Sequence, residues 1–400
     1  MNRKKILFCE SNIDGTIGGS FYSLFYLVEG LDKSKYEPCV IFYQQHSLLP
    51  LFNKAGIKTE IFILPKPVHL TLFDNGFLGV FRKPVKLIQS GVNFYRFFIR
   101  QSLKYRKYII KNKIDLVHLN NTILRNHNWM LAARLSGIKC VTHERGVNNY
   151  FPYLARFFAR HIDAIICISG AVEDNLKNRG MDSGQLVKIF NGIDPDCVIV
   201  EKEKNEILDK YNIPHSSPVI GIVGNIRGWK GQEIVVRAIS IIKLKYPEIR
   251  CFIVGDYSEN ERDYYEHLQS IIDKLNIVEN VIFTGYQSNV ASFMNAMEIV
   301  IHASILPEPF GRVLIEAMAL SKALVGSNEG AVPEIIVEGK TGLMFDVGDY
   351  KGLADIVISL LDNPEYRKQI GENGRVRLNE EFHIKRNVEL TQKLYEKLLA

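Results

Sequence analysis

The stretch Val219-Ile-Gly-Ile-Val-Gly-Asn-Ile-Arg-Gly-Trp-Lys-Gly231 decides the fold of this chain. Its first five residues are apolar and mostly β-branched, which is typical of a buried strand. Two glycines then bracket a short loop, and the apolar pattern that follows is helical. A strand, a glycine loop and a helix in this order indicate one unit of a parallel α/β sheet.

Two cations make the same loop a candidate phosphate site. Arg227 can bind two oxygens in a fork and Lys230 can act as a point charge, so together they suit a diphosphate. Solvated surface cations are the alternative interpretation. The position of the loop between a strand and a helix favours the phosphate site.

Apolar strand patterns and amphipathic helical patterns alternate along the whole chain. The predicted strands lie at 5–9, 39–43, 58–63, 116–119, 139–142, 164–168, 186–190, 219–223, 250–254, 281–284, 299–301 and 323–326. We therefore expect an α/β protein with two doubly wound, Rossmann-like domains, 1–193 and 194–375. A helix at about 376–400 is expected to pack back on the first domain, and the charged stretch 201–211 to be a mobile connection. Because such sheets bind ligands at the carboxyl ends of their strands, the active site should lie in a cleft between the domains.

Length and composition agree with two domains. A chain of 400 residues exceeds what one hydrophobic core usually supports. Up to Pro195 there are 27 Lys and Arg against 14 Asp and Glu, a net charge of +13, and the remainder has 23 against 30, a net charge of −7. Opposite charge on the two halves supports separate domains and allows the basic half an anionic partner.

The sequence also indicates the compartment. No run of about eighteen uncharged apolar residues occurs, and the apolar stretch after Lys5 is too short for a secretory signal. The six cysteines show no Cys-x-x-Cys spacing, so we expect reduced core residues in a cytosolic protein.

The segment Glu308-Pro-Phe-Gly-Arg-Val-Leu-Ile-Glu316 places two carboxylates around the start of an apolar helix. The backbone amides of Phe310, Gly311 and Arg312 would lie at the helix N-terminus, where they can meet an anion. Glu316 could then hold a hydroxyl group while the amides hold phosphate, and Glu308 stays in the loop. A solvated, proline-rich loop with two exposed carboxylates is the alternative interpretation.

Two features of the first half also point to a ligand. Gly18 and Gly19 lie in a glycine-rich loop between the first strand and a helix, so backbone amides there could approach an anion. The spacing is not that of a dinucleotide fingerprint, and a flexible turn is the alternative. His143 follows the strand at 139–142, where α/β sites are built. A structural, hydrogen-bonding histidine is the alternative there.

A basic segment stands apart from these motifs. No acidic residue occurs between Gly76 and Ile114, where ten Lys and Arg gather. Five of them follow helical spacing and are predicted to share one face: Arg96, Arg100, Lys104, Lys107 and Lys111. Such a face, with aromatic residues around it, suits an anionic membrane surface or a lipid pyrophosphate. An ordinary solvated face is the alternative, and we expect no nucleic acid because no nucleic-acid motif accompanies the charge.

Together these elements resemble the family 4 retaining glycosyltransferases of the GT-B fold over nearly the whole chain. The resemblance is carried by the Glu-x7-Glu pair Glu308 and Glu316, the loop 224–231, Gly255-Asp256, Phe283-Thr-Gly-Tyr286 and Gly330-Ala-Val-Pro-Glu334. Weaker matches are Gly18-Gly19, His143 and Asn191-Gly-Ile-Asp194. The sequence departs from the family pattern at Asn225, where an arginine is usual, so whether Arg227 is the phosphate fork stays open. It departs again at Ala331, where a second glycine is usual.

The resemblance implies transfer of a hexose-type sugar from a UDP or GDP donor to a hydroxyl of a glycan or lipid-linked glycan in surface polysaccharide biosynthesis. It further implies retention at the anomeric carbon and no cofactor or metal. It places the enzyme in the cytoplasm, at the inner face of the membrane. By this likeness Arg227 and Lys230 hold the diphosphate, Glu316 binds the ribose, and Glu308 contacts the sugar. The remaining residues of the implied site are Gly18, Gly19, Asn225, Gly255, Tyr286, Phe310, Gly311 and Arg312 at the donor and His143 at the transferred sugar.

Other functions share the fold. A nucleotide-sugar 2-epimerase, a phosphorylase and a non-catalytic sugar-nucleotide-binding subunit of a synthase complex are the alternatives. Whether Glu308 is a nucleophile also stays open, and we favour a binding role because no second carboxylate opposite it can be identified.

Overall fold

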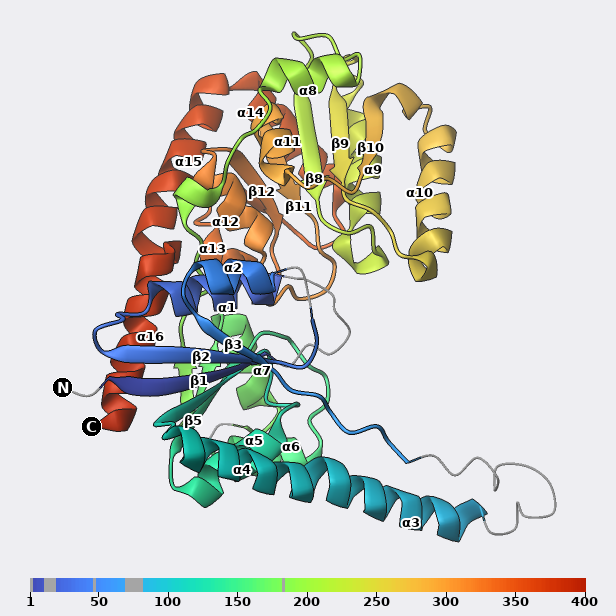
Figure 1. Cartoon of the computed structure of the whole chain (residues 1–400). Coiled ribbons are helices and arrows are strands. Elements are labelled where there is room, and N and C mark those ends of the chain that lie inside the picture. The colour runs from blue at the N-terminus through green and yellow to red at the C-terminus, as the bar shows by residue number, and fades with distance from the viewer. Residues whose placement is uncertain (1–2, 11–18, 46–47, 69–81, 182–183) are drawn as a thin grey trace. The chain divides into compact units, whose positions relative to one another are not determined.

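A computed structural model describes residues 3–10, 19–45, 48–68, 82–181 and 184–400 (Figure 1). The chain divides into two compact units. Unit 1 comprises Met1–Ile168, Val172–Ile189 and Val388–Ala400, and unit 2 comprises Ser169–Ala171 and Phe190–Asn387. The chain thus passes into unit 2 close to the expected boundary at 193/194, and the last part of the expected C-terminal segment belongs to unit 1.

Unit 1 is built on a seven-stranded sheet of order β3-β2-β1-β4-β5-β6-β7. Its strands are β1 (Lys4–Glu10), β2 (Tyr36–Phe42), β3 (Lys58–Ile61), β4 (Leu116–Asn120), β5 (Lys139–Glu144), β6 (Ala164–Cys167) and β7 (Leu186–Lys188). Every neighbouring pair is parallel. The strand order reverses between β1 and β4, so the carboxyl ends of these strands border the switch point where doubly wound sheets bind ligands.

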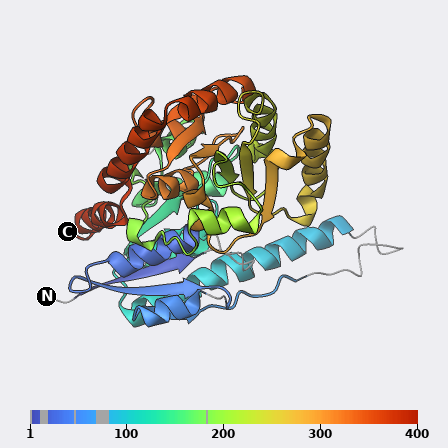
Figure 2. The same ribbon diagram turned by 90° about the horizontal axis from the view of Figure 1, so that it is seen from above.

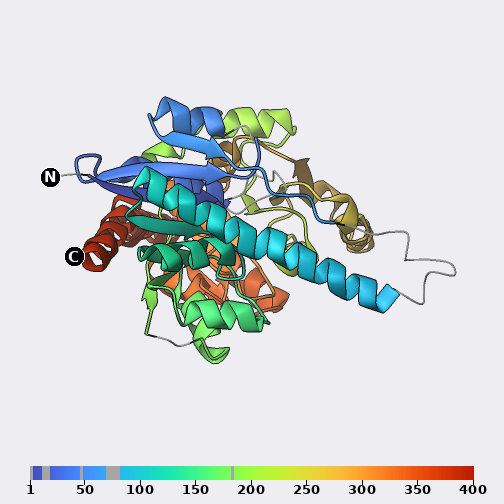
Figure 3. The same ribbon diagram turned by 60° about the horizontal axis from the view of Figure 1, so that its bottom comes forward.

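Eight α-helices lie wholly or partly in the described part of unit 1. They are α1 (Gly19–Gly30), α2 (Leu49–Lys54), α3 (Arg82–Phe94), α4 (Arg100–Asn112), α5 (His127–Ser136), α6 (Tyr153–Ala159), α7 (Gly170–Asn178) and α16 (Ile384–Leu399). A π-helical turn at Tyr95–Ile99 joins α3 to α4. Figures 2 and 3 show the two helices as one long rod, whose α3 end runs beyond the sheet of unit 1.

Aromatic packing holds α4 and α5 together. Trp129 of α5 is fully buried, and its ring stacks on Tyr105 of α4 with 4.0 Å between the ring centroids. Its indole N–H donates to the Tyr43 hydroxyl at 2.8 Å, which satisfies the polar atom of a buried tryptophan. On another side of unit 1, the end of α16 contributes the fully buried Tyr395.

Unit 2 contains a six-stranded parallel sheet of order β10-β9-β8-β11-β12-β13. Its strands are β8 (Val219–Val223), β9 (Arg250–Val254), β10 (Val281–Gly285), β11 (Ile299–His302), β12 (Ala323–Ser327) and β13 (Leu343–Phe345). Its helices are α8 (Lys204–Lys210), α9 (Gln232–Ile242), α10 (Arg262–Lys274), α11 (Val290–Ala296), α12 (Arg312–Ala319), α13 (Val332–Ile335), α14 (Tyr350–Asp362) and α15 (Pro364–Arg377). Isoleucine and valine of the strands and helices form its core.

The predicted alternation of strands and helices is confirmed, but the prediction was wrong for two segments. The short strand Leu343–Phe345 was not predicted, because three residues give little periodic signal. The charged stretch 201–211, expected to be a mobile connection, contains helix α8. This helix begins with a capping box between Glu203 and Glu206 and buries Ile207 and Leu208, so local capping and burial override the charge.

The cysteines agree in part with the expectation of reduced core residues. All six cysteines are free, and four are buried, but Cys39 is half-buried and Cys197 is exposed, so these two are not core residues. None of the helices in the described ranges is long and apolar enough to cross a membrane.

Candidate functional site

The glycine loop after β8 packs directly against the segment that follows β11. Gly231 has a φ of 72°, and a Cβ there would lie 1.9 Å from the carbonyl oxygen of Ala303, so only glycine fits. One residue pair ties the two segments further, because the amide of Ile305 donates to the carbonyl of Trp229 at 2.8 Å. This packing fixes Lys230, at the end of the loop, beside the segment that carries Glu308.

Lys230 and Glu308 form an ion pair at the carboxyl edge of the unit 2 sheet. The Lys230 Nζ lies 2.6 Å from the Glu308 Oε2, and both side chains are half-buried. The ammonium group also lies over the ring of Trp229, 4.2 Å from its centroid. The sequence predicted both residues for the site but placed Lys230 at the donor phosphates and Glu308 at the sugar, so their direct contact is new.

Two residues that the sequence did not single out complete the surroundings of Glu308. Ser304 donates its hydroxyl to the Glu308 Oε2 at 3.1 Å, and the Nε2 of His302 lies 3.5 Å from the same oxygen. Burial raises the pKa of Glu308, but the hydrogen bond from His302 and the charge of Lys230 outweigh it and hold the pKa at about 2. Glu308 is therefore a carboxylate at neutral pH. It can accept hydrogen bonds from hydroxyl groups and cannot serve as a proton donor.

His302 was missed because strand β11 is one residue longer than predicted. The apolar run ends at Ile301, and His302 continues the strand as a buried polar residue. Its Nδ1 is buried and has no hydrogen-bond partner in the described part of the chain. A histidine at the carboxyl end of a strand, shortly before Glu308, was the available signal.

Gly330 allows the loop after β12 to approach the backbone of Glu308. It has a φ of 61°, and a Cβ there would lie 2.5 Å from the backbone nitrogen of Glu308. The next residue, Ala331, donates its amide to the Glu308 carbonyl at 3.0 Å, and its methyl group is fully buried. The alanine that replaces the usual second glycine therefore points into the protein.

Helix α12 begins where the sequence predicts, directly after Gly311, which has a φ of 81°. Among the residues that the structure describes, no side chain forms a capping hydrogen bond at its amino end. Phe310 is buried and contacts Phe190 and Phe382, at centroid distances of 6.3 and 6.0 Å. These contacts fix the backbone at the amino end of the helix.

Glu316 lies one turn into α12 and forms an ion pair with Arg312. The Nη2 of Arg312 donates to the Glu316 Oε1 at 2.9 Å. Both side chains are half-buried. The carboxylate expected to hold the ribose is thus oriented by an arginine that the sequence assigned to the donor.

The other predicted donor residues of unit 2 lie at or near the ends of the same strands. Asn225, Arg227 and Tyr286 are exposed. Gly255 has a φ of 140° and packs on the backbone of Gly224. The exposure of Asn225 and Arg227 leaves both side chains accessible to a ligand.

His143 lies in unit 1, inside strand β5 and not after it, because this strand extends two residues beyond its predicted end. Its side chain is buried, and its Nδ1 is 2.7 Å from the Nε2 of His118. The Nδ1 of His118 in turn contacts the hydroxyl of Tyr395. Burial, followed by the charge of Arg145 and the neighbouring His118, lowers the pKa of His143 well below its ordinary value. His143 is therefore neutral. Its Nδ1 contacts His118, and its Nε2 is the other ring nitrogen.

The carboxyl edge of the unit 1 sheet carries a buried polar network that the sequence did not predict. The fully buried Glu10 accepts hydrogen bonds from the side chains of Asn120 and Asn121. Arg145 donates to the Asn120 Oδ1 at 3.0 and 2.9 Å from its Nε and Nη2. The network spans the ends of β1, β4 and β5, the region of the switch point.

Glu144 is a second buried carboxyl group at this edge. It accepts hydrogen bonds of 2.9 Å from the hydroxyl of Thr122 and from the amide of Ile123. Burial outweighs these bonds and raises the pKa of Glu144 to about 7.

Of the predicted glycine pair in unit 1, Gly18 lies outside the described residues. Gly19 is the first residue of α1, and its carbonyl accepts the hydroxyl of Ser23 at 2.9 Å. Its predicted role at the donor phosphates stays a prediction.

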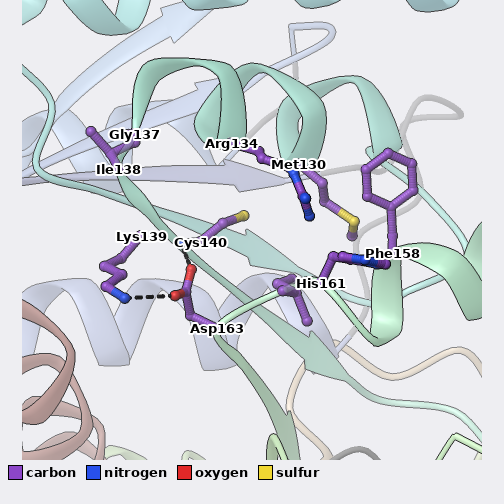
Figure 4. A pocket seen from close by; sticks show the side chains of 10 residues that line it. Met130, Arg134, Gly137, Ile138, Lys139, Cys140, Phe158, His161 and Asp163 are labelled. Atoms are coloured by element: carbon purple, nitrogen blue, oxygen red, sulfur yellow. Dashed lines mark hydrogen bonds and ion pairs between the residues drawn. The ribbon is translucent and has the colours of Figure 1, made fainter.

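A cavity of about 240 Å³ in unit 1 lies at the opposite edge of the sheet (Figure 4). Its lining includes Lys139 and Cys140, the first residues of β5, so it lies at the amino end of that strand. Two of its charged groups are paired with each other, since the Nζ of Lys139 lies 2.9 Å from Asp163 Oδ1. The position favours a structural role, because ligands of such sheets bind at the carboxyl ends.

Metal-ligating side chains are not grouped in the ranges that the structure covers. No set of three or more His, Cys, Asp or Glu residues there is arranged to hold a metal ion.

Comparisons with known proteins agree with this geometry. The family model described as Glycosyltransferase Family 4 matches residues 17–197, and that described as Glycosyl transferases group 1 matches residues 203–377. The N-acetyl-alpha-D-glucosaminyl L-malate synthase of Bacillus anthracis is 27% identical over 302 residues, covering 72% of this chain and 76% of that protein. The capsular polysaccharide biosynthesis glycosyltransferase CapM of Staphylococcus aureus is 29% identical over 223 residues, covering 54% of this chain and 57% of that protein.

The fold agrees as well. The crystal structure of Anabaena HepE in complex with UDP superposes with a TM-score of 0.81 at 21% identity, covering 98% of this chain and 100% of that chain. With a matching family model on each half of the sequence and a matching fold over nearly its whole length, the chain belongs to the family 4, or group 1, glycosyltransferases and has the GT-B fold.

Proposed function

We propose that this glycosyltransferase moves a hexose-type sugar from a UDP or GDP donor, with retention, to a hydroxyl of a glycan or lipid-linked glycan. The observation that carries the proposal is the cluster of Lys230, Glu308 and the uncapped amino end of α12 at one edge of the unit 2 sheet. A nucleotide diphosphate sugar presents phosphate oxygens next to sugar hydroxyls. The cluster offers a cation and the amino end of a helix next to a carboxylate, which is the complementary arrangement.

Lys230 changes partners on donor binding in this proposal. Without donor, its ammonium group neutralises Glu308 at 2.6 Å. With donor, the diphosphate competes for the ammonium group, and Glu308 accepts hydrogen bonds from the sugar. Negative charge builds up on the diphosphate as the sugar leaves, so a cation held beside it stabilises the transition state more than the ground state.

We assign Glu308 to binding and not to nucleophilic attack. Its Oε2 already meets Lys230, Ser304 and His302. Three donors on one oxygen reduce its nucleophilicity and fix its orientation. The proton of the acceptor hydroxyl then passes to the leaving phosphate, so no side-chain base is required.

The relatives support the choice of substrates. The HepE structure holds UDP, which supports a uridine donor, and CapM acts in capsular polysaccharide biosynthesis, which supports a surface glycan as product. Arg312 holds Glu316 in position for the ribose in this proposal. Asn225, Arg227, Gly255 and Tyr286 complete the pocket, and His143 offers its Nε2 to the transferred sugar.

We further propose that the enzyme works in the cytoplasm at the inner face of the membrane, through its basic helix. The side chains of Arg100, Lys104, Lys107 and Lys111 are exposed on α4 as required. Arg96 is half-buried and lies within the π-helical turn, which shifts the helical phase between α3 and α4. The face is therefore made by four of the five predicted residues.

A transfer assay tests the proposed reaction. The purified protein is incubated with UDP- and GDP-hexoses and a lipid-linked glycan acceptor, and the anomeric configuration of the product is read by proton NMR. An α-linked product from an α-linked donor is expected. An inverted product would contradict retention. Conversion of the donor without acceptor would indicate an epimerase, and donor binding without any turnover would indicate a binding subunit.

A further inference from the structure

Helix α3 exposes the apolar side that a helix of a globular protein normally buries. Leu87 and Ile88 are 76% and 64% exposed, and Phe94 and Tyr95, two turns further along the chain, are 53% and 56% exposed. Positions i, i+1, i+7 and i+8 share one face of an α-helix, so these four side chains form one surface, the α3 apolar face. From Lys83 to Tyr95 no residue is buried.

A polar residue on the opposite side of α3, Asn93, ties the helix to the preceding segment of unit 1. Asn93 binds the backbone of Val68 twice, accepting from its amide at 2.8 Å and donating to its carbonyl at 3.0 Å. On a helix, Asn93 lies opposite the middle of the α3 apolar face. It shares its side of the helix with Gln89 and Ser90. The contact that anchors the helix therefore turns its apolar face outward.

The sequence around this face is basic. No acidic residue occurs between Gly76 and Ile114. Lys83 and Lys86 are exposed on α3, and α4, which continues the rod, exposes Arg100, Lys104, Lys107 and Lys111. The rod carries α3 beyond the sheet (Figures 2 and 3), so the face is presented at the end of an extension.

We propose that α3 is an in-plane membrane anchor. Leu87, Ile88 and Phe94 enter the boundary between headgroups and acyl chains, Tyr95 lies at the interface with its hydroxyl in water, and Lys83, on the flank of the α3 apolar face, contacts anionic headgroups. An apolar face beside a basic one is what such helices require. Charge selects this occupant over a second copy of the chain, since two such helices would bring like charges together.

This proposal is independent of the donor site. It goes beyond contact through the basic face of α4, because it assigns part of the affinity to apolar insertion, which salt does not screen. A helix that lies in the interface needs no membrane-spanning length.

Vesicle flotation tests the insertion. The intact protein is mixed with vesicles of phosphatidylcholine containing phosphatidylglycerol at physiological salt. The variant Leu87→Ser/Ile88→Ser keeps every charge but loses two inserted side chains, so its partition coefficient should fall at least about tenfold. The matched control is Leu244→Ser/Val278→Ser in unit 2, at residues that are 82% and 60% exposed, and it should bind as the wild type does.

A depth measurement separates insertion from surface adsorption. Leu87→Trp should be quenched by lipids brominated on the acyl chains, whereas Leu244→Trp should not. The two native tryptophans, the buried Trp129 and the half-buried Trp229, add a background common to both variants. An unquenched Trp at position 87, or equal vesicle binding of the serine variant and its control, would overturn the proposal.

Two further readouts keep the interpretation specific. Light scattering reports the oligomeric state, and a loss of self-association in Leu87→Ser/Ile88→Ser without loss of vesicle binding would assign the face to a second copy and contradict the anchor. UDP and GDP binding should be the same in this variant and the wild type. If the donor proposal is wrong, the wild type itself will fail to bind UDP or GDP, while its vesicle binding will be unaffected.

Discussion

The two sheets have the same order of their central strands, but the titratable groups at their carboxyl edges differ in charge state. In unit 2, Lys230 and Glu308 meet as a half-buried ion pair, and the pKa of Glu308 is held at about 2. In unit 1, burial lowers the pKa of His143 well below its ordinary value and raises that of Glu144 to about 7. The unit 2 edge therefore keeps this pair charged, whereas at the unit 1 edge His143 and Glu144 favour their neutral forms beside the charged Arg145.

The difference teaches that burial without an opposite charge neutralises a group, whereas burial with one keeps it ionised. A charged edge suits a nucleotide diphosphate. The unit 1 edge is rich in amides and also carries a neutral histidine, His143, and a partly protonated carboxyl group, Glu144; these neutral groups, called the neutral edge below, suit sugar hydroxyls, which both donate and accept hydrogen bonds. Four substitutions test whether the two edges divide the work in this way.

Lys230→Ala should have the largest effect. Loss of the cation beside the leaving diphosphate is expected to lower kcat by on the order of 10² to 10³. Steady-state kinetics with saturating donor measure it. Lys245→Ala is the matched control, since Lys245 also pairs with a carboxylate at 2.6 Å, that of Asp362, but on an exposed surface. Near-wild-type turnover of Lys230→Ala would remove the charged edge from the reaction.

Glu308→Gln keeps the shape of the side chain and removes its charge. We expect kcat to fall by on the order of 10², because an amide cannot accept hydrogen bonds on both of its terminal atoms. The same assay measures the change. A variant that loses all turnover but forms a covalent sugar adduct at another residue would point to a different mechanism for this edge.

His143→Asn tests the neutral edge. The asparagine side chain can still reach His118 in place of Nδ1, but it has no atom at the position of Nε2. We expect kcat to fall about tenfold, with unchanged nucleotide affinity, because a neutral hydrogen bond to the sugar is lost and no charge is removed. If UDP or GDP affinity falls with it, His143 acts on the fold or on the diphosphate and not on the sugar.

Glu144→Gln makes the same chemical change as Glu308→Gln and should have the smallest effect on turnover, less than about threefold. Its main effect concerns stability. Because the folded pKa of about 7 lies above the ordinary value of 4.5, the folded protein binds the extra proton between these pH values. Stability from this group is therefore full below pH 4.5 and is lost as the pH rises through 7.

Thermal unfolding between pH 5 and 8 measures this contribution. The wild type should lose up to about 3 kcal/mol from this group over the range, which corresponds to several degrees in Tm. Glu144→Gln should show a flatter profile. An equally steep profile in the variant would mean that Glu144 is ionised in the folded protein and that the neutral edge is not neutral there.

Much of the fold followed from the sequence, because each sheet consists of repeated apolar strands separated by helices. The stretch at Val219–Val223 and its glycine loop were predicted correctly, whereas the three-residue strand Leu343–Phe345 was too short to detect. Helix α8 was missed because its charged residues hide the two buried ones, Ile207 and Leu208.

The site was predicted less completely. Lys230, Glu308 and the amino end of α12 could be found because glycine and proline mark their loops. The contacts of Glu308 with His302 and Ser304 could not, since these depend on where β11 ends and how the next loop folds back. The network of Glu10 with Asn120 and Asn121 joins residues more than a hundred positions apart, which no local pattern reveals.

Nucleotide binding measured by isothermal titration calorimetry tests the central claim most directly. Wild type, Lys230→Ala and Lys245→Ala are titrated with UDP and with GDP. We expect one of the two nucleotides to bind the wild type and Lys245→Ala with equal affinity. The same nucleotide should bind Lys230→Ala at least about tenfold more weakly, because this variant loses a charge-assisted contact with the diphosphate. Equal affinity of all three proteins for that nucleotide would contradict the assignment of the charged edge to the diphosphate.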